Sequence, residues 1–405
     1  MKLRPRLYVL LAVLALPAVT YGQADLNELV DAELDSLLSV YKHLHSHPEL
    51  SYEEKETARY LAGGLRELGF EVTENVGDYG LEGRTSYGLV GVLRNGPGPT
   101  VMVRTDLDAL PVTENTGVGY ASLRKTLNEN GVEVGVMHAC GHDVHMTSFV
   151  GTARLLTALQ DHWSGTLVMI GQPAEERGAG ARAMLDAGLY ERFPKPDYAL
   201  ALHTSASLEA GKIGYREGYV LANVDSVDIT VRGAGGHGAY PHTTEDPVVL
   251  AAQLVLALQT IVSREVSPLE PAVVTVGSIH GGTKHNIIPD QVHLQLTVRS
   301  YKPAVRKKVL AAIKRITEGV AAAAGVPPAR APIVSFSEEE FTPTTYNHPA
   351  LTRRLVPELQ RVLGSDNVVE IDPVMAGEDF SRYSLEDYSI PIFLFWVGGV
   401  DPARY

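Results

Sequence analysis

Apolar and polar residues along this chain repeat with two different periods, and the changes of period mark its predicted elements. Over residues 26–69 apolar positions recur every three to four residues with Glu or Lys between them, which predicts helix. Strand patterns cover residues 89–93, 101–103, 167–170, 198–202 and 392–397. Further helical patterns cover residues 146–159 and 351–363. Strands that alternate with helices indicate an α/β layer with a largely parallel sheet.

A different order of patterns covers residues 215–334. Strand patterns lie at 225–231, 272–279, 291–299 and 333–336, and helical patterns lie at 247–263 and 304–324. The resulting order β-α-β-β-α-β is the split, ferredoxin-like arrangement, which folds as a compact small domain. The predicted fold class is therefore α/β, with a central, mostly parallel sheet flanked by helices and interrupted by a ferredoxin-like α+β domain.

The N-terminus has the pattern of a targeting signal. Lys2, Arg4 and Arg6 precede an apolar stretch at residues 7–19, which is short for a membrane span. Small residues then follow, so we expect a signal peptide at residues 1–24 that is cleaved after Ala24; the alternative is an uncleaved N-terminal anchor. The protein is thus expected to be exported, periplasmic or secreted, and to make no membrane contact after cleavage, because no later stretch looks apolar enough to span a bilayer.

The composition excludes some classes of protein. The chain has 405 residues, of which 45% are hydrophobic and 20% charged, a balance typical of folded proteins. Its formal net charge of −13 argues against nucleic acid as a partner. Cys140 is the single cysteine, so the chain has no internal disulfide. That thiol must be buried, exposed or bound to a metal.

Residues 137–145, with the sequence Met-His-Ala-Cys-Gly-His-Asp-Val-His, concentrate groups that bind metals. Cys140 and His142 can converge on one ion because Gly141 permits a tight turn between them. Asp143 and His138 are placed to hydrogen-bond a ligand ring and fix its tautomer. His145 is expected to start a helix rather than to bind metal. The alternative is a buried structural cysteine beside surface histidines.

Carboxylates and one further histidine follow three of the predicted strands. Glu175 and Glu176 come after the strand at 167–170, where one carboxylate could bind an ion and the other move a proton. Asp106 and Asp108 alternate, so they would point the same way and could bind metal or orient a ligand. His203 follows the strand at 198–202. Taken singly, these groups also fit a solvated helix surface and turn-forming aspartates.

Six ordered signatures resemble those of the aminoacylase and carboxypeptidase metallohydrolases, specifically the branch of hippurate hydrolases and auxin-conjugate amidohydrolases. The resemblance covers nearly all of the chain beyond the signal peptide. The signatures read R-T-D-L-D-A-L-P (104–111), M-H-A-C-G-H-D-V-H (137–145), Q-P-A-E-E (172–176), G-A-G-G-H-G-A-Y-P-H (233–242), G-G-T-K-H-N-I-I-P-D (281–290) and M-A-G-E-D-F (375–380).

This resemblance implies an enzyme that cleaves the amide bond of N-acyl amino acids or small peptides with two divalent metal ions, Mn or Zn. It further implies a catalytic domain at residues 25–214 and 335–405, a lid and dimerisation domain at 215–334, and a homodimer formed through that lid. The implied metal ligands are Cys140, His142, Glu176 and His203. Glu175 would be the general base, His237 would stabilise the oxyanion in the partner subunit's site, and Asn286 and Arg299 would hold the substrate carboxylate. Asp106, Asp108 and Asp143 would support the ligands.

This sequence departs from the family's pattern in two places. The family has a last metal-ligand histidine beyond the strand at 392–397, and none follows here before Tyr405. We expect the sequence to be clipped at the C-terminus, the alternative being an incomplete metal position. Residues 112–136 form a longer stretch than usual, which could reshape the rim of the pocket. Two other functions stay open: a dipeptidase or carboxypeptidase of the same fold, and a non-catalytic exported binding protein.

Overall fold

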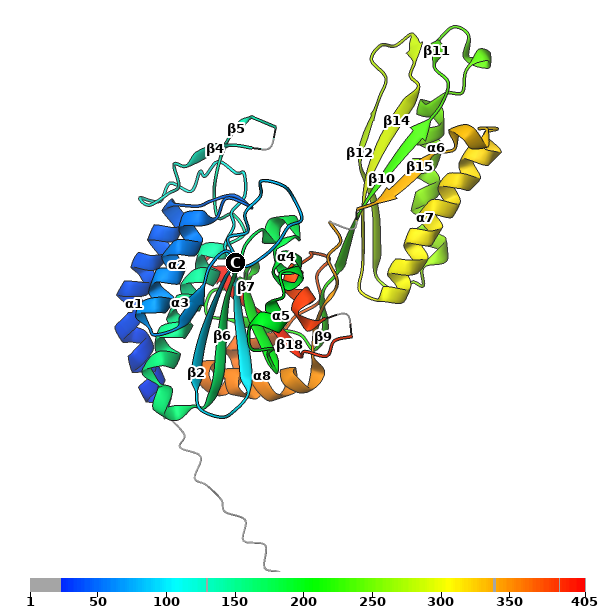
Figure 1. Cartoon of the computed structure of the whole chain (residues 1–405). Coiled ribbons are helices and arrows are strands. Elements are labelled where there is room, and N and C mark those ends of the chain that lie inside the picture. The colour runs from blue at the N-terminus through cyan, green and yellow to red at the C-terminus, as the bar shows by residue number, and fades with distance from the viewer. Residues whose placement is uncertain (1–22, 129, 338–339, 386, 405) are drawn as a thin grey trace, which may run out of the picture.

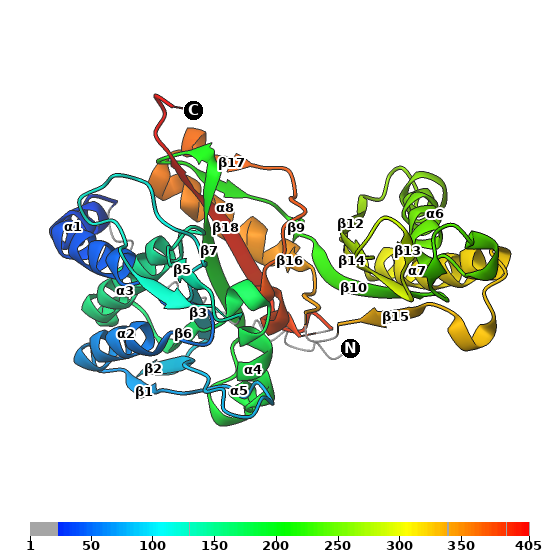
Figure 2. The same ribbon diagram turned by 90° about the horizontal axis from the view of Figure 1, so that it is seen from above.

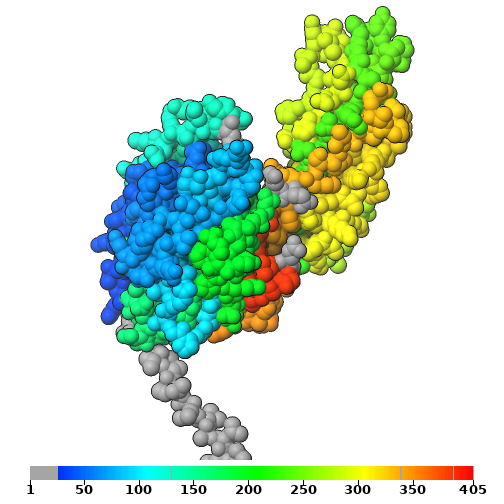
Figure 3. All heavy atoms as spheres, viewed as in Figure 1, coloured from blue at the N-terminus to red at the C-terminus, as the bar shows by residue number. Residues whose placement is uncertain are grey.

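The structure is a computed structural model that describes residues 23–128, 130–337, 340–385 and 387–404. The basic and apolar parts of the predicted signal peptide lie outside these residues. The chain forms a large unit and a small unit that extends away from it (Figures 1 and 3). Two stretches connect the units, one from β9 (Gly218–Leu221) to β10 (Asn223–Arg232) and the other from β15 (Ile333–Phe336) to β16 (Thr345–Asn347).

The large unit is built on an eight-stranded sheet with the order β1-β2-β6-β3-β7-β18-β8-β17. Its strands are β1 (Glu71–Thr73), β2 (Leu89–Asn95), β3 (Thr100–Asp106), β6 (Gly165–Gln172), β7 (Tyr198–Glu209), β8 (Ile213–Tyr215), β17 (Val368–Glu370) and β18 (Ile392–Val400). The central strands β6, β3, β7 and β18 are parallel to one another. Their carboxyl ends therefore meet at one edge of the sheet, where ligand sites of α/β folds usually lie.

Helices cover both faces of this sheet, as Figure 2 shows from above. A core that includes Leu44, Leu61 and Phe149 packs α1 (Gln23–Ser46), α2 (Lys55–Glu67) and α3 (His142–Ala158) against one face. A second core that includes Met184, Leu189 and Tyr383 joins the other face to α4 (Gly180–Asp186), α5 (Leu189–Arg192) and the 3-10 turn Asp379–Ser384. The helix α8 (Pro349–Leu363) packs through Val356 near β8 and β17.

The small unit is a four-stranded antiparallel sheet with the order β12-β14-β10-β15. Its other elements are α6 (Pro247–Thr260), β12 (Ala272–Gly281), β14 (Gln291–Ser300) and α7 (Pro303–Ala323), so the chain order is the predicted β-α-β-β-α-β. Buried and half-buried residues alternate along β10, and Val227, Ile229 and Val231 face the core shared with both helices. This arrangement and the large sheet confirm the predicted fold class; the exact domain boundaries stay predictions.

Two expectations about helices need correction. The pattern at 26–69 forms two helices, because Pro48 cannot donate a backbone hydrogen bond and keeps the residue before it out of helical geometry.

The second expectation is that no stretch after the signal peptide looks apolar enough to span a bilayer. The segment Pro247–Glu265 is nevertheless long and apolar enough to pass a length-and-hydropathy test for a membrane span, with a mean hydropathy of 1.5. Core helices of soluble proteins pass the same test, and one face of α6, including Leu254 and Leu258, is buried against its own sheet.

Candidate metal centre

The predicted metal-binding residues meet at the carboxyl edge of the central strands. β3 ends at Asp106 and β6 ends at Gln172, directly before the turn that holds Glu175 and Glu176. His203, predicted to follow a strand, lies instead within the neighbouring strand β7, which continues to Glu209, and His142 begins α3. Gly141 precedes that helix with φ of 80°, a conformation that side chains rarely adopt, and this lets the chain turn sharply after Cys140.

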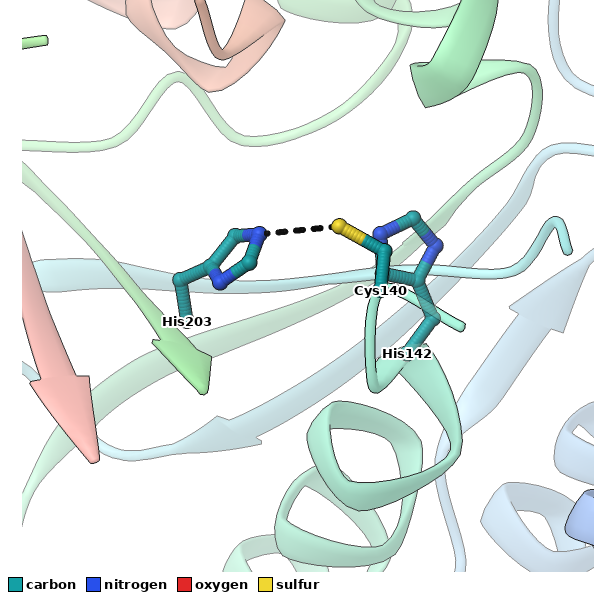
Figure 4. A group of neighbouring side chains, drawn as sticks. All are labelled: Cys140, His142 and His203. Atoms are coloured by element: carbon teal, nitrogen blue, oxygen red, sulfur yellow. Dashed lines mark hydrogen bonds between the residues drawn. The ribbon is translucent and has the colours of Figure 1, made fainter. Parts of the chain in front are cut away.

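Cys140 and His203 approach each other from different elements, with 3.5 Å between Sγ and the ring Nε2 (Figure 4). Nδ1 of His203 donates to the carbonyl oxygen of Thr204 at 2.7 Å, which orients Nε2 toward the sulfur. Burial opposes the thiolate, but hydrogen bonds with His142 and His203 outweigh it and lower the pKa of Cys140 to about 6. The thiolate, which is the form that binds metals, is therefore favoured.

His142 presents a free ring nitrogen to the carboxylates. Its Nδ1 donates to the carbonyl oxygen of Asp108 at 2.8 Å, which directs Nε2 toward the carboxylates. Nε2 lies 3.8 Å from Oε1 of Glu176 and 3.9 Å from Oε2 of Glu175. Both His142 Nε2 and Glu176 Oε1 are buried without a hydrogen-bond partner among the described residues. Buried polar atoms without partners are costly, and a bound cation would satisfy both of these.

A pair of divalent cations fits this donor set. Among the described residues, four groups of donor atoms each lie within 4.8 Å of one another. Two of these groups consist of predicted ligands and the predicted base: Cys140, His142 and His203, and His142, Glu175 and Glu176. His142 belongs to both groups, and its Nε2 can bind only one of the two ions. Burial raises the pKa of Glu176 to about 8, with negative Cys140, Asp108 and Asp106 adding to it against His142. Such crowding of negative charge is relieved by cations, and mixed sulfur, nitrogen and oxygen donors suit zinc or manganese.

Asp108 supports the turn that carries the two glutamates. Its Oδ1 accepts from the backbone N–H of Glu175 at 3.1 Å, and its Oδ2 accepts from that of Glu176 at 3.0 Å. Glu54 accepts from the preceding backbone N–H, of Ala174, at 2.8 Å. Ala174 has a φ of 48°, a strained value for a residue with a side chain. The turn is therefore held by buried carboxylates from two other segments.

Asp106 links the metal-binding residues to the buried guanidinium of Arg104. Its Oδ1 accepts from Nδ1 of His145 at 2.8 Å, and its Oδ2 accepts from Arg104 at 2.7 Å. Nε2 of His145 accepts from the backbone N–H of Thr204 at 2.9 Å, so His145 is a neutral ring. Burial lowers the pKa of His145 to about 4, which agrees with that state. His145 thus positions the residue after His203 from the first turn of α3.

Asp143 and His138 differ from their predicted contacts. Oδ2 of Asp143 lies 2.7 Å from Nδ1 of His45, and Nε2 of His45 lies 3.1 Å from Oε1 of Glu114. Asp143 therefore ties α3 to α1 and does not hold a ligand ring. Both ring nitrogens of the buried His138 have no hydrogen-bond partner in the described parts of the chain. The tautomers of His142 and His203 are fixed by backbone carbonyls instead, which side-chain patterns cannot reveal.

The three residues predicted to contact substrate lie in two places. Arg299 lines a cavity of about 450 Å³ together with Glu175 and Glu378, and its Nη1 donates to the carbonyl oxygen of Met375 at 2.7 Å. His237 is exposed in the short strand β11 (Gly236–His237), and its partner strand is β13 (Ile287–Ile288), next to Asn286. Figure 1 shows β11 at the tip of the small unit, far from β7. Within one chain, therefore, only Arg299 of the three lies near Glu175.

The most substantial contact missed by sequence reasoning surrounds Arg104. Its guanidinium donates to Gln172 at 2.8 Å, to Glu378 at 2.8 Å and to Asp379 at 3.1 Å, besides Asp106. The arginine and the acidic pair both lie in quoted signatures, but 274 positions separate Arg104 from Glu378. Glu54 was missed because an acidic run resembles a solvated helix start.

Comparison with known proteins places this geometry among characterised folds. A family model described as Peptidase family M20/M25/M40 matches residues 102–404. The chain is 39% identical over 361 residues to thermostable carboxypeptidase 1 of Saccharolobus solfataricus, covering 88% of this chain and 84% of that protein. It is 35% identical over 347 residues to an N-acetyl-L-cysteine deacetylase of Bacillus subtilis, covering 86% and 77%. A solved Bacillus subtilis structure, described as a dinuclear metal binding peptidase from the M20 family, superposes with a TM-score of 0.71 at 31% identity, covering 91% and 89%.

Proposed function

The chain belongs to peptidase family M20/M25/M40 and is a metal-dependent amide hydrolase, and within that class we propose that it cleaves the amide bond of N-acyl amino acids. One observation carries this proposal. The four predicted metal ligands converge from three segments of the chain, and Glu175 lies beside them as a further carboxylate. A protein that only captured metal or ligand would not need that carboxylate. Cleavage of dipeptides or of C-terminal residues is the second candidate, because a carboxypeptidase is among the relatives.

The residues of the centre divide the work as follows. Cys140, His142, Glu176 and His203 would hold two divalent ions, Mn or Zn. When bound, the ions would polarise the amide carbonyl and acidify a water molecule. Glu175 would accept a proton from the attacking water and donate it to the leaving amine. Burial raises the pKa of Glu175 well above its usual range, and negative Glu378 and Asp379 add to this, so the group can carry that proton.

Metal removal tests the activity directly. Purified protein treated with a chelator should lose at least about a hundredfold of its hydrolysis rate toward N-acetyl and N-benzoyl amino acids, because ions of this kind supply several kcal/mol of transition-state stabilisation. Added Mn²⁺ or Zn²⁺ should restore the rate, and elemental analysis should verify the metal content at each step. Full activity in verified metal-free protein would contradict the proposal. A faster rate on dipeptides than on every acyl amino acid would favour the second candidate.

We also propose a homodimer formed through the small unit. β12 is a terminal strand of the described small sheet, and α6 exposes Leu256 by 73% and Val249 by 55%. Contact between copies would cover these side chains and satisfy the strand edge. His237 and Asn286 are remote from Glu175 in their own chain, and the dimer would bring them to the partner subunit's site. There His237 would stabilise the oxyanion, and Asn286 would hold the substrate carboxylate together with Arg299.

Light scattering tests the dimer. The protein should have twice the mass of one chain, and Leu256→Asp should shift it toward the mass of one chain because it places a charge in the apolar contact. Leu81→Asp changes an exposed leucine of the large unit, which is 47% exposed, and should leave the mass unchanged. A single-chain mass for the unmodified protein would rule out this dimer.

Export remains a proposal that rests on the N-terminal pattern. Cleavage after Ala24 would remove only the first two residues of α1, which begins at Gln23. The mature protein should then begin at Asp25, and it should be found outside the cytoplasm. Mass measurement of the purified protein and fractionation of the producing cells test both points.

A further inference from the structure

Two cavities open next to the turn of Glu175 and Glu176, and different kinds of residue line them. The larger, of about 450 Å³, is the one that contains Arg299, and its other lining residues are mostly polar or charged. The smaller, of about 250 Å³, has an apolar wall made of Leu50, Leu110, Pro111 and Leu127. We refer to it as the hairpin cavity. Glu176 lines both cavities, so an amide bond held at Glu176 would have one end in each.

The hairpin cavity takes its name from β4 (Lys125–Leu127) and β5 (Glu133–Gly135), which pair as an antiparallel hairpin within the unusually long stretch 112–136. Leu127 ends β4 and is 62% exposed, although it lines a cavity that reaches the metal centre. An exposed leucine at such a position would lose its contact with water when an apolar ligand entered. The hairpin therefore adds an apolar surface that an N-acyl substrate could cover.

Hydrogen bonds hold this wall in place. The Asn128 side chain accepts from the backbone N–H groups of Asn130 and Val132, each at 3.0 Å, and so fixes the turn after Leu127. At the base of the hairpin the N–H of Val136 donates to the carbonyl oxygen of Arg124 at 3.1 Å. Leu110 exchanges backbone hydrogen bonds with Met137 at 3.0 and 3.1 Å, which joins the apolar wall to the segment that carries Cys140. The cavity is thus a preformed part of the site.

We propose that the hairpin cavity binds the acyl group of the substrate, that it favours an aromatic or branched apolar acyl group over acetyl, and that Leu127 determines this preference. The inference rests on the proposed hydrolysis of N-acyl amino acids. A cavity of about 150 Å³ is enough to hold benzene, so a benzoyl ring fits the volume here. The amino acid portion then lies on the Arg299 side, where a planar guanidinium suits its carboxylate.

The chemical step agrees with this orientation. Water adds to the acyl carbon, the bond between that carbon and the amide nitrogen breaks, and the nitrogen leaves as an amine with a proton supplied through Glu175. The carboxylic acid product keeps its apolar part in the hairpin cavity and its new carboxylate at Glu176. Arg84 and Arg177 also line the cavity, with the Arg84 guanidinium 4.6 Å from the centre of the Tyr52 ring. If these two arginines bound the substrate carboxylate in this cavity, the substrate would lie in the reverse orientation, which is the competing outcome of the test.

The experiment compares kcat/KM for N-benzoyl and N-acetyl derivatives of the same amino acid in the metal-loaded protein. We expect the unmodified protein to prefer the benzoyl substrate by roughly tenfold or more, and Leu127→Ser to lower the benzoyl-to-acetyl ratio by roughly tenfold, the size of effect that a few apolar contacts produce. Leu123→Ser is the matched control, since Leu123 belongs to the same stretch, is 92% exposed and does not line the cavity. It should leave the ratio unchanged. Calorimetric titration with benzoate and acetate should show the same order of affinity and the same dependence on Leu127.

The outcomes separate this inference from the function on which it rests. Hydrolysis of both substrates with a ratio that Leu127→Ser does not change, or changes no more than Leu123→Ser does, would overturn the acyl assignment and leave the amidohydrolase intact. A larger effect of Leu127→Ser on the choice of amino acid than on the choice of acyl group would show the reverse orientation, and would also overturn it. No hydrolysis of any N-acyl amino acid by metal-loaded protein would overturn the proposed function itself.

Discussion

Glu175→Gln is expected to lower kcat by about a thousandfold or more while the protein keeps its metal ions. Proton transfer by a positioned carboxylate contributes roughly 10²–10⁴ to the rate, and an amide cannot accept that proton. The substitution preserves shape, and the turn should persist because Asp108 binds the backbone N–H of residue 175 and not its side chain. Steady-state kinetics on an N-acyl amino acid, together with elemental analysis of the same preparation, measures both effects.

Glu176→Gln is the matched comparison because the two glutamates are adjacent and their turn is held by the same aspartate. Oε1 of Glu176 is buried without a hydrogen-bond partner in the described structure, so its replacement should reduce both metal content and rate. If Glu175→Gln kept near-normal activity, the assignment of the general base would be wrong. If both variants lost metal equally, Glu175 would be a ligand and not the proton carrier.

The sequence predicted those parts of the centre that lie close to strand ends. The pair Glu175 and Glu176, and also His203, could be placed at the centre because each follows an apolar run, and parallel strands bring their carboxyl ends to one edge. The choice of Glu176 as the metal ligand and of Glu175 as the base came from the family resemblance. Cys140 and His142 could be paired because two positions separate them. Local pattern thus identifies which groups converge whenever the fold class is known.

Contacts between distant segments could not be predicted in this way. Two ligand rings are oriented by carbonyl oxygens, and every residue has a carbonyl. Asp143 was expected beside a ligand ring, but His45 lies closer in space and binds it. The helical pattern at 26–69 continues across Pro48, but the structure has a break there, which the proline itself predicts. The short strands β4 and β5 lack an apolar run because they pair only with each other, at the surface.

The buried cluster around Arg104 gives the centre its fixed geometry. Arg104 holds Asp106 from one signature together with Glu378 and Asp379 from another, and all four side chains are at most 1% exposed. Asp106 in turn fixes His145, which binds the backbone of Thr204 next to His203. A single guanidinium therefore connects the last signature of the chain to the metal-binding strand ends. Loss of this cation should affect stability as well as catalysis.

Arg104→Met is expected to lower the free energy of unfolding by about 3–5 kcal/mol, because it leaves buried carboxylates without their cation. Arg59→Met is the matched control: Arg59 pairs with Glu56 at 2.7 Å, but these side chains are 58% and 59% exposed, so the loss should stay below about 1 kcal/mol. Thermal and urea unfolding of both variants, in the metal-free state, measures the difference. An Arg104→Met variant as stable as Arg59→Met would show that the cluster contributes nothing.

The pH dependence distinguishes lost charge from lost packing. Burial raises the pKa of Asp379 to about 7 even with Arg104 beside it, and removal of the arginine should raise this pKa further. An acid whose pKa is higher in the folded than in the unfolded state takes up protons on folding, so its contribution to stability falls as pH rises. The deficit of Arg104→Met relative to the unmodified protein should therefore be larger at pH 8 than at pH 5. A deficit that did not change with pH would assign the role of Arg104 to packing alone, since neutral carboxyls need no cation.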